Sequence, residues 1–128
     1  MSDKSKNYER VWENAEVAGH AAAKATIPTP MIVGTPTTPL GDDIDPSKTI
    51  YYVPQGVCGF ASIHFKGNTS FGRWAKKAEK AKKAYGVGLY APVSVGGQSY
   101  ETKVAYARAF VGVLQEEDIE AWVESRLD

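Results

Sequence analysis

The residue types best suited to nucleophilic chemistry are scarce in this chain of 128 residues, which contains one cysteine and two histidines. A cysteine nucleophile needs an imidazole within hydrogen-bond reach. Cys58 and His64 fall six residues apart on one predicted strand, and at about 3.3 Å per residue they would lie ~20 Å apart. Only His20, on a different predicted element, could approach the thiol. We therefore expect Cys58 to be a small buried structural residue and the protein not to be an enzyme.

A metal site is equally poorly supported. The two histidines and the cysteine form no pair at the i, i+3 or i+4 spacing of metal ligands on a helix. The densest carboxylate group is Asp42, Asp43 and Asp45, and calcium loops do use alternating oxygen ligands. The remainder of an EF-hand loop is missing, so we interpret this group as an acidic turn and expect neither metal nor cofactor.

Two glycine turns could cradle a phosphate. Gly86-Val-Gly88 follows a predicted helix rather than a strand and lacks the third glycine of a dinucleotide fingerprint. The better candidate comprises Gly96, Gly97, Gln98 and Ser99, which join a predicted strand to a helix start, where backbone amides and the helix dipole favour an anion. The alternative is an ordinary two-glycine turn into a capped helix.

The unusual surface is basic. Between Lys66 and Tyr85 there are seven basic residues and one acid, a net charge of +6, and the rest of the chain, with eight basic and fourteen acidic residues, carries −6. On a helix, one stripe would contain Arg73, Lys76, Lys77, Lys80 and Lys83. Three interpretations remain open: a solvated face, a phosphate-binding stripe, or a contact with an acidic patch on a partner or second copy.

Composition limits the kinds of protein this can be. The chain is 43% hydrophobic and 23% charged with zero net charge, a balance that predicts one globular domain. The opening residues 1–6 do not resemble a signal peptide, and no apolar run approaches the ~20 residues that span a bilayer. We expect a protein of a reducing cytoplasm without membrane association.

The N-terminal third predicts a helix followed by an arm. Residues 7–25 place Tyr8, Val11 and Trp12 on one apolar stripe, with small residues at the C-terminal end that allow close approach to a neighbour. Prolines end this helix near Thr26. Residues 27–49 contain five of the seven prolines and predict an extended arm over a hydrophobic surface, which could also grip another subunit.

The remainder alternates strands and helices. Residues 50–53 and 57–65 read as strands that pair as a hairpin, the second being central in its sheet because both its faces are apolar. A helix is predicted from a cap at residues 68–70 to about Ala84, burying Phe71 and Trp74. Residues 87–95 predict a strand that is at an edge or bulged, because Pro92 lies within it.

A capped helix after Ser99 is predicted to run to about Gln115, with a wide apolar stripe. Residues 119–127 then alternate as a half-buried strand, with Ile119, Ala121, Val123 and Leu127 facing inward. The predicted fold is α+β: an N-terminal helix and proline-rich arm, then β-β-α-β-α-β with one sheet of about four strands. We expect the two later helices on one face of the sheet and the first helix over part of the other.

Five segments have distinctive sequences: residues 28–34, 56–61, 68–77, 97–110 and 125–128. Together they resemble a set of small uncharacterised proteins encoded by tailed bacteriophages and prophages. The resemblance implies an accessory protein in the cytoplasm of an infected bacterial host. It implies no reaction, so no catalytic residue follows from it.

The leading functional hypothesis is therefore a non-enzymatic protein that binds a host or phage macromolecule, with a protein partner favoured and homo-oligomers through the arm as an option. The alternative is a nucleic-acid-binding protein that uses the lysine-rich second helix. A third hypothesis is an oligomer that sequesters a nucleotide-like anion at the Gly96–Gly97 turn.

Overall fold

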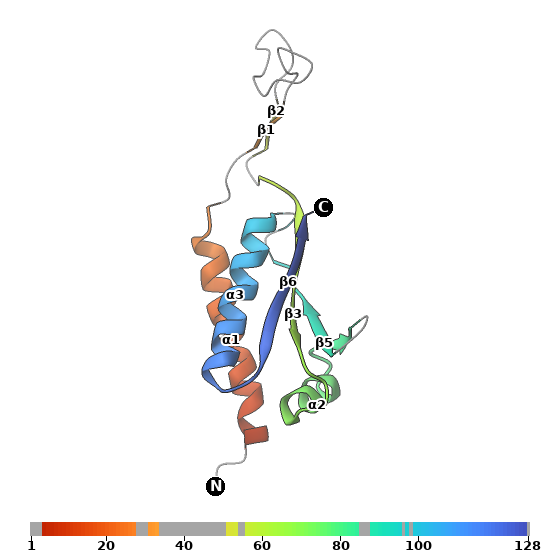
Figure 1. Cartoon of the computed structure of the whole chain (residues 1–128). Helices are drawn as coiled ribbons and strands as arrows, with labels where there is room; N and C mark the ends of the chain where they lie inside the picture. Colours follow the sequence, from red (N-terminus) through yellow and green to blue (C-terminus); the bar gives the residue numbers. More distant parts are fainter. Residues whose placement is uncertain are drawn as a thin grey trace.

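The structure is a computed structural model that describes residues 4–27, 31–33, 51–53, 56–84, 88–95, 97 and 99–127. Within these residues it forms three helices, a two-stranded ribbon and a four-stranded antiparallel sheet (Figure 1). The elements are α1 (Lys4–Ala25), β1 (Met31–Val33), β2 (Tyr51–Val53), β3 (Gly59–Phe65), α2 (Ser70–Lys77), β4 (Lys82–Lys83), β5 (Leu89–Pro92), α3 (Tyr100–Glu116) and β6 (Ala121–Leu127). The predicted α+β class is confirmed.

The main sheet has the strand order β4-β5-β3-β6, so β3 is central as predicted. It pairs antiparallel with β5 on one side and β6 on the other. The register sets Ser62 opposite Pro92 on β5 and opposite Glu124 on β6. Pairing with β6 thus brings residues that are far apart in sequence onto adjacent strands.

α1 and α3 pack on one side of this sheet, and α2 lies at its end, where it contacts the start of α1 (Figure 1). α1 and α3 lie side by side against the sheet (Figure 1), and the Trp12 ring of α1 meets Phe110 of α3 at 4.7 Å between centroids and Phe65 of β3 at 6.3 Å. The expectation that the first helix covers the opposite face is therefore wrong. An amphipathic stripe shows that a helix buries one side, but not which surface receives it.

An aromatic cluster joins the helices to the sheet. Its members are Tyr8, Trp12, Phe65, Phe71, Trp74 and Phe110. Tyr8 meets Phe71 edge to face at 5.4 Å, which holds the start of α1 against α2. Phe71 is buried as predicted, whereas Trp74 is half-buried and packs on the margin of the core.

The small residues of α1 have the predicted consequence. Gly19 is buried where α1 crosses α3, and a Cβ there would come within 2.7 Å of the Tyr106 ring. The helix ends as predicted: the Thr26 hydroxyl donates to the Ala22 carbonyl at 2.7 Å, and the proline at position 28 follows.

The second helix is shorter than predicted. Thr69 is its N-cap and accepts from the Gly72 N–H at 2.9 Å, which confirms the predicted start. The helix ends at Lys77 rather than Ala84, and Glu79 adopts a left-handed φ of 60° in the turn that follows. Residues 82–83 then pair with β5. Strand pairing has overridden the helix propensity of an alanine- and lysine-rich segment.

The predicted hairpin between residues 50–53 and 57–65 is wrong. β2 pairs with β1, setting Met31 opposite Val53, whereas β3 pairs within the main sheet. The β1–β2 ribbon lies beyond the ends of α1 and α3 (Figure 1). The arm therefore contains a strand, and its residues 28–30 and 34–49 lie outside the described part of the chain.

The strands β5 and β6 agree with the predictions only in part. β5 is shorter than predicted, but Pro92 does sit at a local edge: β4 pairs with Tyr90 and Leu89 only, so no described strand lies beside the proline nitrogen. In β6, Ala121 is buried and Val123 half-buried as predicted, whereas Leu127 is 59% exposed.

Candidate functional site

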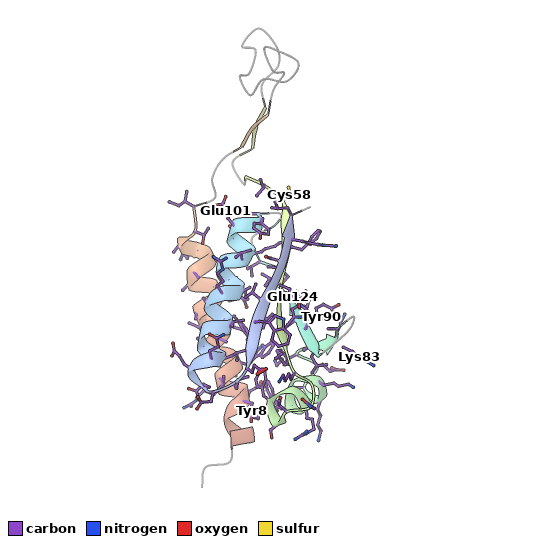
Figure 2. The ribbon with its side chains drawn as sticks, in the orientation of Figure 1. Tyr8, Cys58, Lys83, Tyr90, Glu101 and Glu124 are labelled. Carbon is purple, nitrogen blue, oxygen red and sulfur yellow. The ribbon has the colours of Figure 1, made fainter. Side chains whose placement is uncertain are left out.

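The side of the main sheet that faces away from the helices is covered by no described element. Odd-numbered residues of β3 face the helices, and Ile63 and Phe65 among them are at most 2% exposed. Even-numbered positions face the other way, and Phe60 there is 47% exposed. Figure 2 labels Glu124, Tyr90 and Lys83 on this side. We call this surface the open face.

Three rings form a row across the open face. His64 of β3 lies between Tyr90 of β5 and Trp122 of β6, its partners in the register. The ring centroids are 5.9 and 6.0 Å apart, and the planes differ by only 25° and 26°. This stacking leaves the His64 residue 8% exposed although nothing described lies above the sheet. The imidazole is therefore held in a fixed orientation.

A groove of about 670 Å³ runs over the open face next to this row. Its walls include Phe60, Ser62, His64, Tyr90, Glu124 and Arg126. Lys83 also borders it, from β4. We call this hollow the open-face groove; it combines aromatic surface, a hydroxyl and both signs of charge.

Polar side chains in the groove form a continuous relay. The Ser62 hydroxyl lies 2.7 Å from His64 Nε2, and His64 Nδ1 lies 3.4 Å from a carboxylate oxygen of Glu124. The same Glu124 oxygen accepts a hydrogen bond from the Trp122 indole at 3.0 Å. A hydroxyl, an imidazole and a carboxylate in this order constitute the arrangement of an activated nucleophile.

Phe60 lies at the end of the open-face groove away from Tyr90, and two cations lie beside its ring. The guanidinium of Arg126 lies 5.1 Å from the ring centroid and the Lys103 ammonium lies 5.3 Å from it. Both cations are within cation–π range. Lys103 is 8% exposed and donates to the Gly59 carbonyl at 3.2 Å. On the open face, Arg126 therefore places an exposed positive charge beside the exposed Phe60 ring, whereas the Lys103 charge is buried.

The predicted basic stripe is not one helical face. Arg73, Lys76 and Lys77 lie on α2, Lys80 lies in the following turn, and Lys83 lies on β4. All are exposed except the half-buried Lys80. Residues 66–84, which we call the basic lobe, hold seven basic residues and one acid and border the Tyr90 end of the open-face groove. Because the helix ends at Lys77 and not at Ala84, Lys83 lies in the sheet and not on a helix.

Most of these cations are unneutralised within the described residues. Lys66 pairs with Glu120 of the turn before β6 at 3.0 Å. Across the described ranges no carboxylate lies within salt-bridge distance of Lys76, Lys77, Lys82 or Lys83. The basic lobe therefore keeps its positive field available to a ligand.

The candidate anion turn is only partly described. Gly96 and Gln98 lie outside the described residues, and Gly97 is exposed with a left-handed φ of 58°. Ser99 is the N-cap of α3 as predicted: its hydroxyl accepts from the Thr102 N–H at 3.3 Å and from the Thr102 hydroxyl at 3.0 Å. The Ser99 side chain is thus engaged by its own helix and 1% exposed.

The remaining chemical candidates stay apart. Cys58, which lies just before β3 (Figure 2), is half-buried, not fully buried as expected. Its backbone forms an isolated antiparallel β-bridge with that of Ser99. His20 is exposed on α1 and its ring meets Tyr106 at 5.2 Å. The described residues hold no cluster of three or more His, Cys, Asp or Glu placed for a metal ion. The acidic turn at residues 42–45, with Asp42, Asp43 and Asp45, falls outside the described part of the chain.

Sequence reasoning missed the Ser62–His64–Glu124 relay. Spacing alone puts Ser62 and His64 on one face of a predicted strand, because side chains at i and i+2 point the same way. Glu124 joins the group through the β3–β6 register, which no local pattern reveals.

Comparison with known proteins found no match. No protein-family model, no curated protein and no solved structure matches the chain. No helix in the described ranges is both long and apolar enough to cross a membrane. The resemblance to bacteriophage proteins remains a prediction.

Proposed function

We propose that the protein is a binding protein for single-stranded nucleic acid and that the strand lies on the open face. The observation that carries the proposal is an uncovered antiparallel sheet whose aromatic groove is bordered by the basic lobe. Binding requires no catalytic step.

The aromatic rings supply the first half of the argument. Single-strand binding surfaces use side-chain rings as platforms on which bases stack, at about 1–3 kcal/mol per base. Phe60 is 47% exposed and Tyr90 is half-exposed in the same groove. A flat sheet face accommodates splayed bases, which a duplex does not offer.

The charges supply the second half. Lys82 and Lys83 lie beside Tyr90 at one end of the groove, and Arg126 lies beside Phe60 at the other. Phosphates between these cations would release condensed counterions, which drives association. The carboxylate in the middle of the groove, Glu124, is engaged by its neighbours His64 and Trp122. The positive charge at both ends is therefore what an extended strand would meet.

The test measures the affinity for a labelled oligothymidylate by fluorescence anisotropy over a series of salt concentrations. We expect Phe60→Ala to weaken binding by about 1–3 kcal/mol, because one base loses its platform. A variant with Lys76, Lys77, Lys82 and Lys83 changed to glutamine should flatten the salt slope by about 0.7 per lost phosphate contact. Val17→Ala, which removes an exposed apolar side chain from α1, and Lys24→Gln serve as matched controls.

Two outcomes would overturn the proposal. The first is wild-type protein that fails to bind the oligonucleotide at low salt. The second is binding that Phe60→Ala leaves unchanged, because the open face would then not be the site.

Self-association is the second candidate, favoured by the separation of charge within one chain. The basic lobe carries a net charge of +6. At the C-terminal end of α3, Glu116, Glu117 and Asp118 form an exposed acidic group. A head-to-tail contact would weaken with salt. Sedimentation velocity at low and high salt tests this; a monomer under both conditions would exclude it.

A further inference from the structure

We propose that Ser62 is an activated nucleophile that cleaves carboxylic esters, with His64 as its general base and Glu124 as the positioning residue. This inference goes beyond nucleic-acid binding and rests on different contacts. It would stand even if the open face bound no nucleic acid.

The distances follow the required order. A serine hydroxyl becomes a useful nucleophile when an adjacent base can take its proton and a third group orients that base. The Ser62 hydroxyl and His64 Nε2 are 2.7 Å apart, and Glu124 lies 3.4 Å from the other imidazole nitrogen. A carboxylate beside Nδ1 favours the tautomer with its hydrogen there, which leaves Nε2 to accept from serine.

The surroundings hold this relay in place and leave it accessible. The stacked Tyr90 and Trp122 rings fix the imidazole from both sides. The Trp122 indole hydrogen bond anchors the Glu124 carboxylate. Ser62 is only half-buried and forms part of the wall of the open-face groove, so a ligand there can reach its hydroxyl.

The reaction balances with an ester and water as the only reactants. Ser62 Oγ attacks the carbonyl carbon and its proton passes to His64 Nε2. The C–O bond to the leaving alcohol breaks, and His64 returns the proton to that oxygen. Water, deprotonated by His64 in the same way, then cleaves the acyl-serine to release the carboxylic acid and restore the hydroxyl.

Two features of the groove indicate the substrate class. The groove walls include Phe60, Tyr90 and Pro92, which favour an apolar or aromatic acyl group. Arg126 lies on the same face of β6 as Glu124, two residues further along, and borders the groove. Its guanidinium can offset the negative charge that develops on the carbonyl oxygen.

The test uses a fluorophosphonate probe on the full chain, without nucleic acid, and follows labelling by intact mass. The probe forms a bond from phosphorus to serine oxygen and releases fluoride. We expect one label on Ser62, located by peptide mapping. The labelling rate should rise with pH along a single proton loss, because only the neutral imidazole accepts the serine proton.

Variants show whether Ser62 reacts because His64 and Glu124 activate its hydroxyl or only because the hydroxyl is exposed. Ser62→Ala should abolish labelling, and His64→Gln should slow it by about 100-fold or more, the range for loss of a general base. Glu124→Gln retains an oxygen for the indole hydrogen bond but loses the charge, so it should slow labelling and alter the pH profile. Ser94→Ala removes an exposed serine outside the open-face groove and should change nothing.

Melting curves of each variant show whether the fold is intact. Wild-type protein that stays unlabelled while a known serine hydrolase reacts fully would overturn the proposal. So would a folded His64→Gln variant that is labelled at the wild-type rate. Either result leaves the nucleic-acid proposal untouched, because oligonucleotide binding depends on Phe60 and the basic lobe.

Discussion

Removing the Trp12 side chain tests whether α1 belongs to the same layer as α3. Trp12 is 6% exposed and touches rings from three other elements: Phe65, Phe71 and Phe110. A Trp→Ala change at a buried site costs about 3–5 kcal/mol through lost burial and the cavity left behind. That is a large share of the roughly 5–15 kcal/mol that stabilises a typical domain.

The measurement is urea unfolding followed by far-ultraviolet circular dichroism, which does not depend on the deleted fluorophore. Val17→Ala is the matched control on the same helix, because Val17 is 68% exposed. Surface changes of this kind stay within about 0.5 kcal/mol. The rings of Trp12 and Phe110 meet edge to face, and a double-mutant cycle between two such rings should give a coupling of about 0.5–1.5 kcal/mol. A cycle that shows no coupling would contradict the placement of α1 beside α3.

Two further predictions concern the contact between α1 and α3. Gly19→Ala should destabilise the protein, because the added methyl group meets the Tyr106 ring, and overpacking costs about 1–3 kcal/mol. In the same urea unfolding assay Gly112→Ala, whose methyl group meets nothing within 4 Å, should gain up to about 1 kcal/mol of stability from its higher helix propensity. A Gly19→Ala variant as stable as the wild type would contradict the close approach. Burial, and then the charge of Glu16, raise the pKa of Tyr106 above its ordinary value of 10.0. The folded state therefore holds this proton more tightly than the unfolded state, so the contribution to stability is complete below the unfolded pKa and declines as the pH rises through the folded pKa. Tyr106→Phe should therefore reduce the loss of unfolding free energy at alkaline pH, measured by urea unfolding. If the variant loses as much stability with pH as the wild type, the raised pKa of Tyr106 is refuted.

Local signals in the sequence determined where several elements begin and end. Residues 68–70 and Ser99 are predicted to supply caps because a polar side chain just before a helix satisfies its free N–H groups, and in the structure Thr69 and Ser99 do so. α1 ends shortly before the proline at position 28, and Pro92 pairs with Ser62 of β3 but has no partner on its β4 side. These features depend on neighbouring residues only, so a single sequence contains them.

Competition between elements decided what the sequence could not. Residues 78–84 have the composition of a helix, yet Lys82 and Lys83 pair with β5 and the helix stops at Lys77. Residues 51–53 pair with β1 rather than with the strand that follows them. In each case pairing with another strand provides the hydrogen bonds, and local propensity is too weak to oppose it.

The open face and its relay belong wholly to the tertiary structure. The sequence showed that α1 has an apolar stripe and that β3 is apolar on both sides, but the side on which α1 packs leaves Phe60 exposed. Ser62 and His64 share a face by strand geometry alone, whereas Glu124 reaches them through the pairing of β3 with β6. Strand register is set by burial along the whole sheet. The residue that completes the candidate site is therefore specified by the fold and not by its spacing along the chain.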